Sequence, residues 1–195
     1  MNLLEELANN VTFMANATKA HLSFLLYLVL LLWVIFLLTR LSGNRLLFLG
    51  IFPRRLVGLP GILFSPFLHG NFNHLFFNSI PLVVLSNFIL FYGYEVYFIV
   101  TIMIALISGI LIWCFAKPGI HIGASSVITG YWSFLVINSY QQGTFMAVAL
   151  GVISLYYFAG IFFGIFPSKK GVSWEGHLFG LVAGILTAYS INYII

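Results

Sequence analysis

The chain is poor in charge. Only 6% of its 195 residues are charged, none of them is aspartate, and its few acids are Glu5, Glu6, Glu95 and Glu175. Soluble globular domains carry about a quarter of charged residues, so this composition excludes that class. The basic residues are scattered at the ends of apolar runs and do not cluster on one face. We therefore expect no nucleic-acid partner, and we expect the basic side chains to reach for lipid headgroups.

Cysteine is nearly absent as well. The single Cys114 lies within an apolar run, where we expect it to pack. It excludes an internal disulfide and leaves the redox compartment open. The histidines lack the clustered spacing of metal ligands, so we expect no metal and no other cofactor. His21 and His121 look incidental.

What the chain has in abundance is hydrophobic sequence, at 62% of residues and a mean hydropathy of +1.08. Crossing a bilayer takes about 20 apolar residues in a helix, because only a helix satisfies its own backbone groups in lipid. We predict an all-α membrane protein with six transmembrane helices. The expected spans are 22–39, 74–92, 96–116, 123–140, 144–166 and 176–193.

The segments outside these spans divide the chain. Residues 1–21 have the helical apolar spacing of an interfacial segment, or form a flexible terminus. No small-residue cleavage site follows the first apolar run, so we read that run as a retained helix. The loop 40–73 holds four arginines but is too apolar to float in water, and we expect it to be partly embedded. Residues 22–195 form the membrane domain in this interpretation.

The fourth expected span carries more polar groups than most of its neighbours. We therefore expect it inside the bundle. Small residues at helical spacing let membrane helices approach closely. Such residues recur on the fourth span and on the sixth: Gly123, Ser126 and Gly130, then Gly176, Gly180 and Gly184. We predict that these two helices touch along their glycine faces.

A serine and a histidine begin these two spans. Ser125 and His177 lie near ends on the same side of the membrane, because two spans separate the starts of the two helices. Ionisable groups in membranes are costly and are functional candidates, and a serine beside a histidine suggests a nucleophile with its general base. Glu175 points to another face of its helix, so a dyad is expected and a triad is not. The alternative is that both residues only pack.

His74 and Asn78 are four residues apart at the start of the second span and project from one helix face. That start lies on the same side as Ser125 and His177. Their side chains can donate hydrogen bonds to the oxyanion of an acyl transfer, together with the Ser125 backbone N–H. Alternatively, His74 bonds the backbone of the long loop and Asn78 bridges two helices. The upstream residues His69, Asn71 and Asn73 look like loop-ordering residues.

Together these motifs resemble the rhomboid family of intramembrane serine proteases, over roughly residues 57–190. Three motifs carry the resemblance: His74-x-x-x-Asn78, Gly123-x-Ser125, and Gly176-His177-x-x-Gly180-x-x-x-Gly184. The resemblance implies a rhomboid-like bundle with Ser125 as nucleophile, His177 as general base and acid, and His74 and Asn78 at the oxyanion. The implied substrates are transmembrane segments of other proteins, and the implied cap of the site is the loop after the fifth span, residues 166–175.

The chain departs from the family pattern at several places. Ser126 stands where the family has glycine after the nucleophile, and Thr129 where an aromatic residue stacks on the histidine. Pro60-Gly61 replaces a Trp-Arg pair of the first loop. Two rival readings follow from the residues: a non-catalytic relative that binds client transmembrane helices, and a small transporter with a polar pathway.

The distribution of basic residues and the family resemblance predict opposite orientations of the protein in the membrane. The loops on the Ser125 side carry seven of the eight Lys and Arg residues, which the positive-inside rule would place in the cytosol. The resemblance implies a site that opens outward, and we adopt that orientation because a long embedded first loop holds four of the seven. We expect a multi-pass protein of a bacterial inner or cell membrane, with lipid and transmembrane substrates as its partners.

Overall fold

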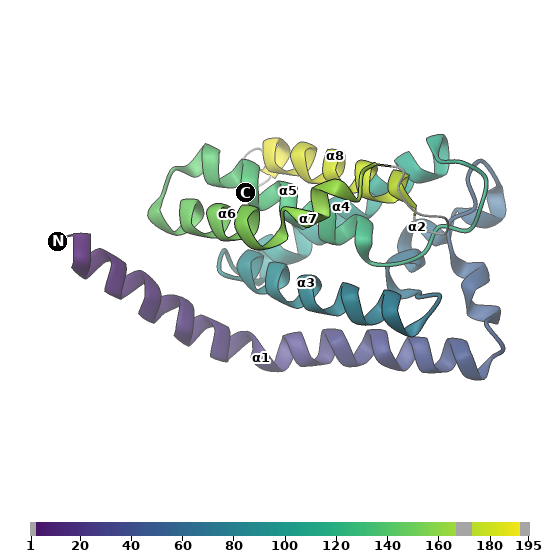
Figure 1. Ribbon diagram of the computed structural model, residues 1–195, viewed down its shortest axis with the longest axis horizontal. Helices are drawn as coiled ribbons and strands as arrows, with labels where there is room; N and C mark the ends of the chain where they lie inside the picture. The colour runs from purple at the N-terminus through teal and green to yellow at the C-terminus, as the bar shows by residue number, and fades with distance from the viewer. Residues whose placement is uncertain (1–2, 167–172, 192–195) are drawn as a thin grey trace.

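The computed structural model describes residues 3–166 and 173–191, and these residues are almost entirely helical (Figure 1). The long helices are α1 (Leu3–Leu41), α3 (Phe72–Leu90), α4 (Tyr94–Phe115), α5 (Ser125–Gln142), α6 (Phe145–Phe158) and α8 (Trp174–Ile191). The short ones are α2 (Gly61–Phe64), α7 (Gly160–Phe163) and three 3-10 turns, Arg45–Leu49, Leu56–Gly58 and Ser65–Phe67. Within the described ranges the only β pairing is an isolated bridge between Ile51 and His121.

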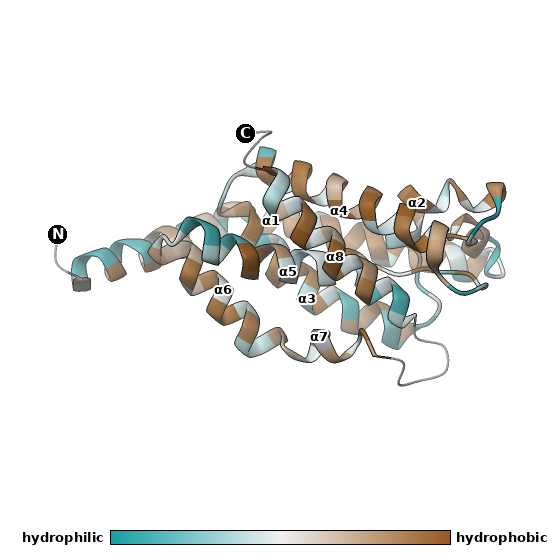
Figure 2. Cartoon of the chain, turned by 90° about the horizontal axis from the view of Figure 1, so that it is seen from above, coloured by the Kyte–Doolittle hydropathy of each residue, from teal (hydrophilic) through white to brown (hydrophobic). Residues whose placement is uncertain are grey.

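Three of these helices are long and apolar enough to span a membrane: Glu5–Leu41 within α1, Phe72–Leu90 and Tyr94–Phe115. Large apolar side chains face outward on them, such as Tyr27 at 71% and Ile102 at 55% exposure. In Figure 2, hydrophobic colour dominates the bundle, and hydrophilic bands gather on the N-terminal part of α1. The chain is an integral membrane protein. The count of six spans stays a prediction, since α5, α6 and α8 are less apolar or shorter.

Helix α5 is the centre of the bundle, because it contacts α3, α4, α6 and α8. Its residues 126–135 are all buried, including the polar Ser126, Thr129 and Ser133. The prediction that the most polar span lies inside the bundle is therefore confirmed. Its hydroxyl groups are satisfied by backbone carbonyls, as burial requires: Thr129 Oγ1 donates to Ser125 O at 2.8 Å, and Ser133 Oγ to Leu181 O at 2.9 Å.

Helix α1 runs without interruption from Leu3 to Leu41 and lies beside α3, and its N-terminal end extends past the other helices (Figure 1). His21 is not incidental. Its imidazole is buried, and Nδ1 donates to Asn87 Oδ1 at 3.0 Å. Asn87 Nδ2 in turn donates to Thr18 Oγ1 at 2.9 Å. These bonds tie α1 to α3 at residue 21. The division into a segment 1–21 and a membrane domain 22–195 stays a prediction.

The first loop is docked against the end of α4. Arg54 has a left-handed backbone, with φ of 58°, and its N–H donates to Trp113 O at 2.9 Å. Its guanidinium donates to the carbonyls of Cys114 and Ala116, at 3.1 and 2.8 Å, which lack helical partners at a C-terminus. The loop thus completes α4 and reaches the segment before α5. Whether it is embedded in the membrane stays a prediction.

Candidate active site

The α5–α8 contact sets the frame of the site. A Cβ atom on Gly180 would collide with the backbone carbonyl of Ser126, and one on Gly184 with that of Gly130. The two backbones therefore meet directly, which only glycine permits at these positions. The predicted contact along glycine faces is confirmed.

This contact brings Ser125 and His177 to the same end of two packed helices. Ser125 is the first residue of α5 and precedes Ser126, and His177 lies one turn before Gly180 on α8. Both side chains are partly exposed, while the residues that follow Ser125 on α5 are buried. The two predicted residues are thus brought to one level of the bundle, at its edge.

The His177 ring is held by a backbone carbonyl. Nδ1 lies 2.8 Å from Gly164 O, just after α7, and must donate because a carbonyl only accepts. Neutral His177 then carries its proton on Nδ1 and leaves Nε2 free to accept one. The sequence did not reveal this partner. A glycine near the end of an apolar run was the available signal, because a Cβ on Gly164 would lie 2.6 Å from Nδ1.

His74 and Asn78 also reach this end of α5. A Cβ on Gly123 would lie 2.6 Å from His74 Nε2 and 3.6 Å from Asn78 Nδ2. Gly123 also has φ of 114°, so glycine is required there both by space and by conformation. The structure therefore gathers all four predicted residues around the start of α5.

His69 has a more specific place than loop ordering. Its imidazole is buried, and Nε2 lies 3.2 Å from Asn78 Nδ2 and 3.5 Å from Ala124 N. Both partners are donors, so Nε2 must accept from them, and His69 must be neutral. The pKa of His69 is lowered to about 4, mainly by burial and also by the charge of His74, while the Phe67 backbone acts in the opposite direction. His69 thus fixes Asn78 and the residue before Ser125.

His121 is likewise not incidental. Nε2 donates to Lys117 O at 2.9 Å, and Nδ1 accepts from Ser173 Oγ at 2.8 Å. Ser173 Oγ also accepts from Gly176 N at 3.1 Å, so His121 ties the loop before α5 to the start of α8. These groups enclose a cavity of about 20 Å³, enough for roughly one water molecule. Its polar lining is Ser65, His121, Ser125, Ser126 and Ser173.

The structure shows the contacts of Ser126 and Thr129, two residues that depart from the family pattern. Ser126 is buried at the α5–α8 contact, with its carbonyl against Gly180. The Thr129 hydroxyl donates a hydrogen bond to the Ser125 carbonyl within α5. The Gly164 carbonyl, not residue 129, accepts the hydrogen bond that holds the His177 ring. In the described part of the chain, no three His, Cys, Asp or Glu side chains are grouped to hold a metal. Most of the cap predicted at 166–175 lies outside the described residues.

The fold and this site define a class: an all-helical integral membrane protein with a serine, histidines and an amide gathered at one end of its central helix. Comparison with protein families identifies residues 58–193 as a Rhomboid domain, so the chain belongs to the rhomboid family. An uncharacterized protein of Mycobacterium tuberculosis is 36% identical over 177 residues, covering 86% of this chain and 74% of the relative. An uncharacterized protein of Mycobacterium leprae is 33% identical over 174 residues, covering 83% and 68%.

Proposed function

We propose that the protein is an intramembrane serine endopeptidase that cleaves transmembrane segments of other proteins with a Ser125–His177 dyad. The observation that carries the proposal is the contact of α5 with α8 at Gly180, one turn from His177 and next to Ser125. It is supported by the Gly164 carbonyl, which fixes the tautomer that a general base needs.

In the proposed reaction Ser125 Oγ attacks the scissile carbonyl carbon, and its proton passes to His177 Nε2. The C–N bond then breaks, and the imidazolium returns the proton to the leaving amine. Water next attacks the acyl carbon and gives a proton to His177 Nε2. The ester C–Oγ bond then breaks, the imidazolium returns the proton to Ser125 Oγ, and the new carboxyl end leaves. The small cavity beside Ser125 offers that water a place, with hydroxyl groups and His121 in its lining as polar partners.

The oxyanion of this reaction would be stabilised from two directions. The first N–H groups of a helix lack intrahelical partners and carry partial positive charge, and Ser125 is the first residue of α5. His74 and Asn78 approach the same place from α3 and would donate from their side chains. His69 accepts from Asn78 Nδ2 and so acts as a positioning residue.

The substrate and the membrane arrangement complete the proposal. A transmembrane helix must unwind locally before its carbonyl can be attacked, because helical amides are hydrogen-bonded and covered. We assign residues 22–195 as a six-span domain of a bacterial inner or cell membrane, residues 1–21 as an interfacial or flexible segment, and the site to the outer face. A reporter fused after Ile195 is expected in the cytosol, and a reporter on the outer face would reverse the orientation.

A second candidate function is a non-catalytic relative that binds client helices. Ser126 favours it, since it stands where the family has glycine and lines the same small cavity as Ser125. A fluorophosphonate probe separates the two, because it reacts only with an activated serine. We expect labelling of the wild-type protein, loss of the label in Ser125→Ala and His177→Ala, and retention in Ser139→Ala near the far end of α5. Folded wild-type protein that takes no label, and leaves single-span substrates intact, would favour the binding function.

A further inference from the structure

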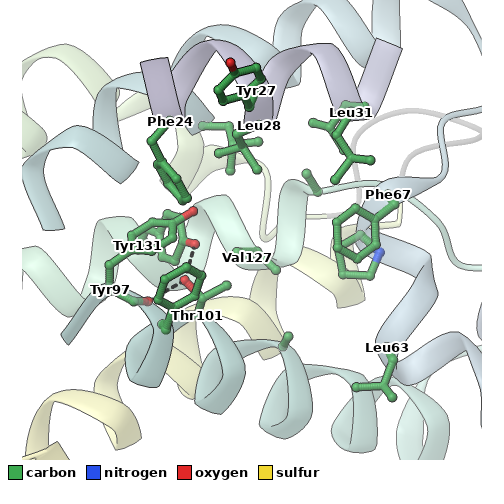
Figure 3. Close-up of a pocket in the computed structure, with 16 residues that line it drawn as sticks. Phe24, Tyr27, Leu28, Leu31, Leu63, Phe67, Tyr97, Thr101, Val127 and Tyr131 are labelled. Atoms are coloured by element: carbon green, nitrogen blue, oxygen red, sulfur yellow. Dashed lines mark hydrogen bonds between the residues drawn. The ribbon is translucent and has the colours of Figure 1, made fainter. Parts of the chain in front are cut away.

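An apolar cavity of about 430 Å³ lies between α1, the first loop, α4 and α5 (Figure 3). Leu31 contributes from α1, Leu63 and Phe67 from the loop, and Ala105 and Val127 from α4 and α5. Four hydroxyl-bearing residues line it, Tyr27, Tyr97, Thr101 and Tyr131, and the hydroxyls of Thr101 and Tyr131 are hydrogen-bonded to each other at 2.6 Å. The rest of the lining is apolar, so the cavity offers mainly hydrocarbon surface.

The cavity opens toward lipid. Tyr27, Leu31 and Phe98 line it and are 71%, 46% and 49% exposed, on two helices that are apolar enough to span the membrane. Water does not enter apolar cavities of this kind. An empty space would forfeit the dispersion contacts of its walls, and a bilayer has acyl chains at its mouth to restore them. A hydrocarbon chain is the occupant that this setting supplies.

The dimensions favour one chain over a helix. The cavity follows α4 from Tyr97 to Ala105, which is about 12 Å along the helix axis. A helix with its side chains is at least about 10 Å across, whereas a single acyl chain needs only a fraction of that width. A helix of a second copy or of a substrate seated there would keep an acyl chain away from the cavity walls, which the test below detects.

We propose that one acyl chain of a membrane phospholipid is bound in this cavity. The bound chain touches Ala124 and Val127, which are buried and lie on either side of Ser125 in sequence. The lipid thus packs against the turn of α5 that begins the candidate active site. The binding itself does not depend on proteolysis.

The test uses the full chain in vesicles that contain a phosphatidylethanolamine with a diazirine on its acyl chain. After photolysis, mass spectrometry maps the modified residues. We expect adducts on Val127 or Tyr131, which are almost fully buried, besides those on the exposed Ile102. Adducts on Ile102 and other exposed residues alone would overturn the proposal, because buried residues are reached only from inside the cavity.

A matched pair of variants sharpens the test. Ala105→Phe places a ring in the cavity and should abolish the adducts at Val127 and Tyr131 while leaving those at Ile102. Leu106→Phe adds a ring on the exposed side of α4, outside the cavity, and should change neither. Leu31→Trp fills the cavity from α1 if Ala105→Phe does not fold. Unchanged labelling at Val127 in both filling variants refutes the site, and this result leaves the serine-probe test untouched.

Discussion

Three glycines recur on one face of α8, and the structure separates them into two that have no room for a methyl group and one that has. A Cβ on Gly180 or Gly184 would meet the backbone carbonyl of Ser126 or Gly130, whereas one on Gly176 finds its nearest atom, Ser173 Oγ, at 3.4 Å. Gly180→Ala and Gly184→Ala should therefore destabilise the protein, and Gly176→Ala should not.

The magnitude follows from two opposing effects. Overpacking a well-packed interface costs about 1–3 kcal/mol, and the upper end applies at Gly180 because the obstacle is backbone and cannot rotate away. In the opposite direction, alanine in a helix interior stabilises the folded state by about 1 kcal/mol relative to glycine. We expect a net loss of about 2 kcal/mol for Gly180→Ala, and a change near zero or a small gain for Gly176→Ala.

Equilibrium unfolding in mixed micelles of dodecylmaltoside and SDS, followed by circular dichroism, measures these differences. The same samples should react more slowly with the fluorophosphonate when Gly180 is replaced, because separating α5 from α8 moves Ser125 away from His177. Equal free energies of unfolding for Gly180→Ala and Gly176→Ala would refute the reasoning. The backbones of α5 and α8 would then not be in direct contact.

Two further predictions concern the histidines. Burial lowers the pKa of His69 to about 4 in the folded protein, against the usual 6.5 in the unfolded chain. Between pH 6.5 and pH 4 the unfolded chain therefore binds more protons than the folded one. The free energy of unfolding should fall by up to about 3 kcal/mol as the pH drops through this range. His69→Gln, which keeps an acceptor, should lose this part of the pH dependence in the same unfolding assay, and an unchanged pH profile would contradict it. Gly164→Ala should displace the His177 ring and slow fluorophosphonate labelling by about 10²-fold, the cost of a misplacement near 1 Å. Gly160→Ala is the control, since a Cβ there meets nothing within 4 Å, and equal labelling of the two variants would count against the role of Gly164.

Helix positions were predictable because the apolar runs are long and their ends carry signals. The expected span 74–92 became α3, Phe72–Leu90, whose cap is Asn71 accepting from His74 N at 2.8 Å. The expected span 144–166 was wrong as one helix: α6 ends at Phe158, and the short α7 follows from Gly160. Hydrophobicity continues through this break, so only the glycines marked it. The apolar spacing of the N-terminal segment was compatible with a helix, but it did not predict that this helix continues without a break into the first span as α1.

The parts of the site that consist of side chains could be predicted from the sequence, and the parts that consist of backbone groups could not. The glycine spacing foretold the α5–α8 contact, and the Ser125, His177, His74 and Asn78 pattern foretold which residues meet at the start of α5. The carbonyl of Gly164 and the acceptor role of His69 were not readable. Any residue has a carbonyl, and only tertiary structure decides which one faces a histidine 13 residues away.

That carbonyl answers a problem that the sequence left open, namely how a histidine without an acid partner keeps its orientation. A carboxylate near the lipid would cost several kcal/mol in desolvation and would have to be balanced by further hydrogen bonds. A carbonyl accepts the same Nδ1 proton at 2.8 Å and brings no net charge. It selects the tautomer as well as a carboxylate does, and it stabilises an imidazolium less. If the proposed dyad operates, it should therefore rely more on the donors at the start of α5 to lower its barrier, where His74 and Asn78 lie and where His69 positions Asn78.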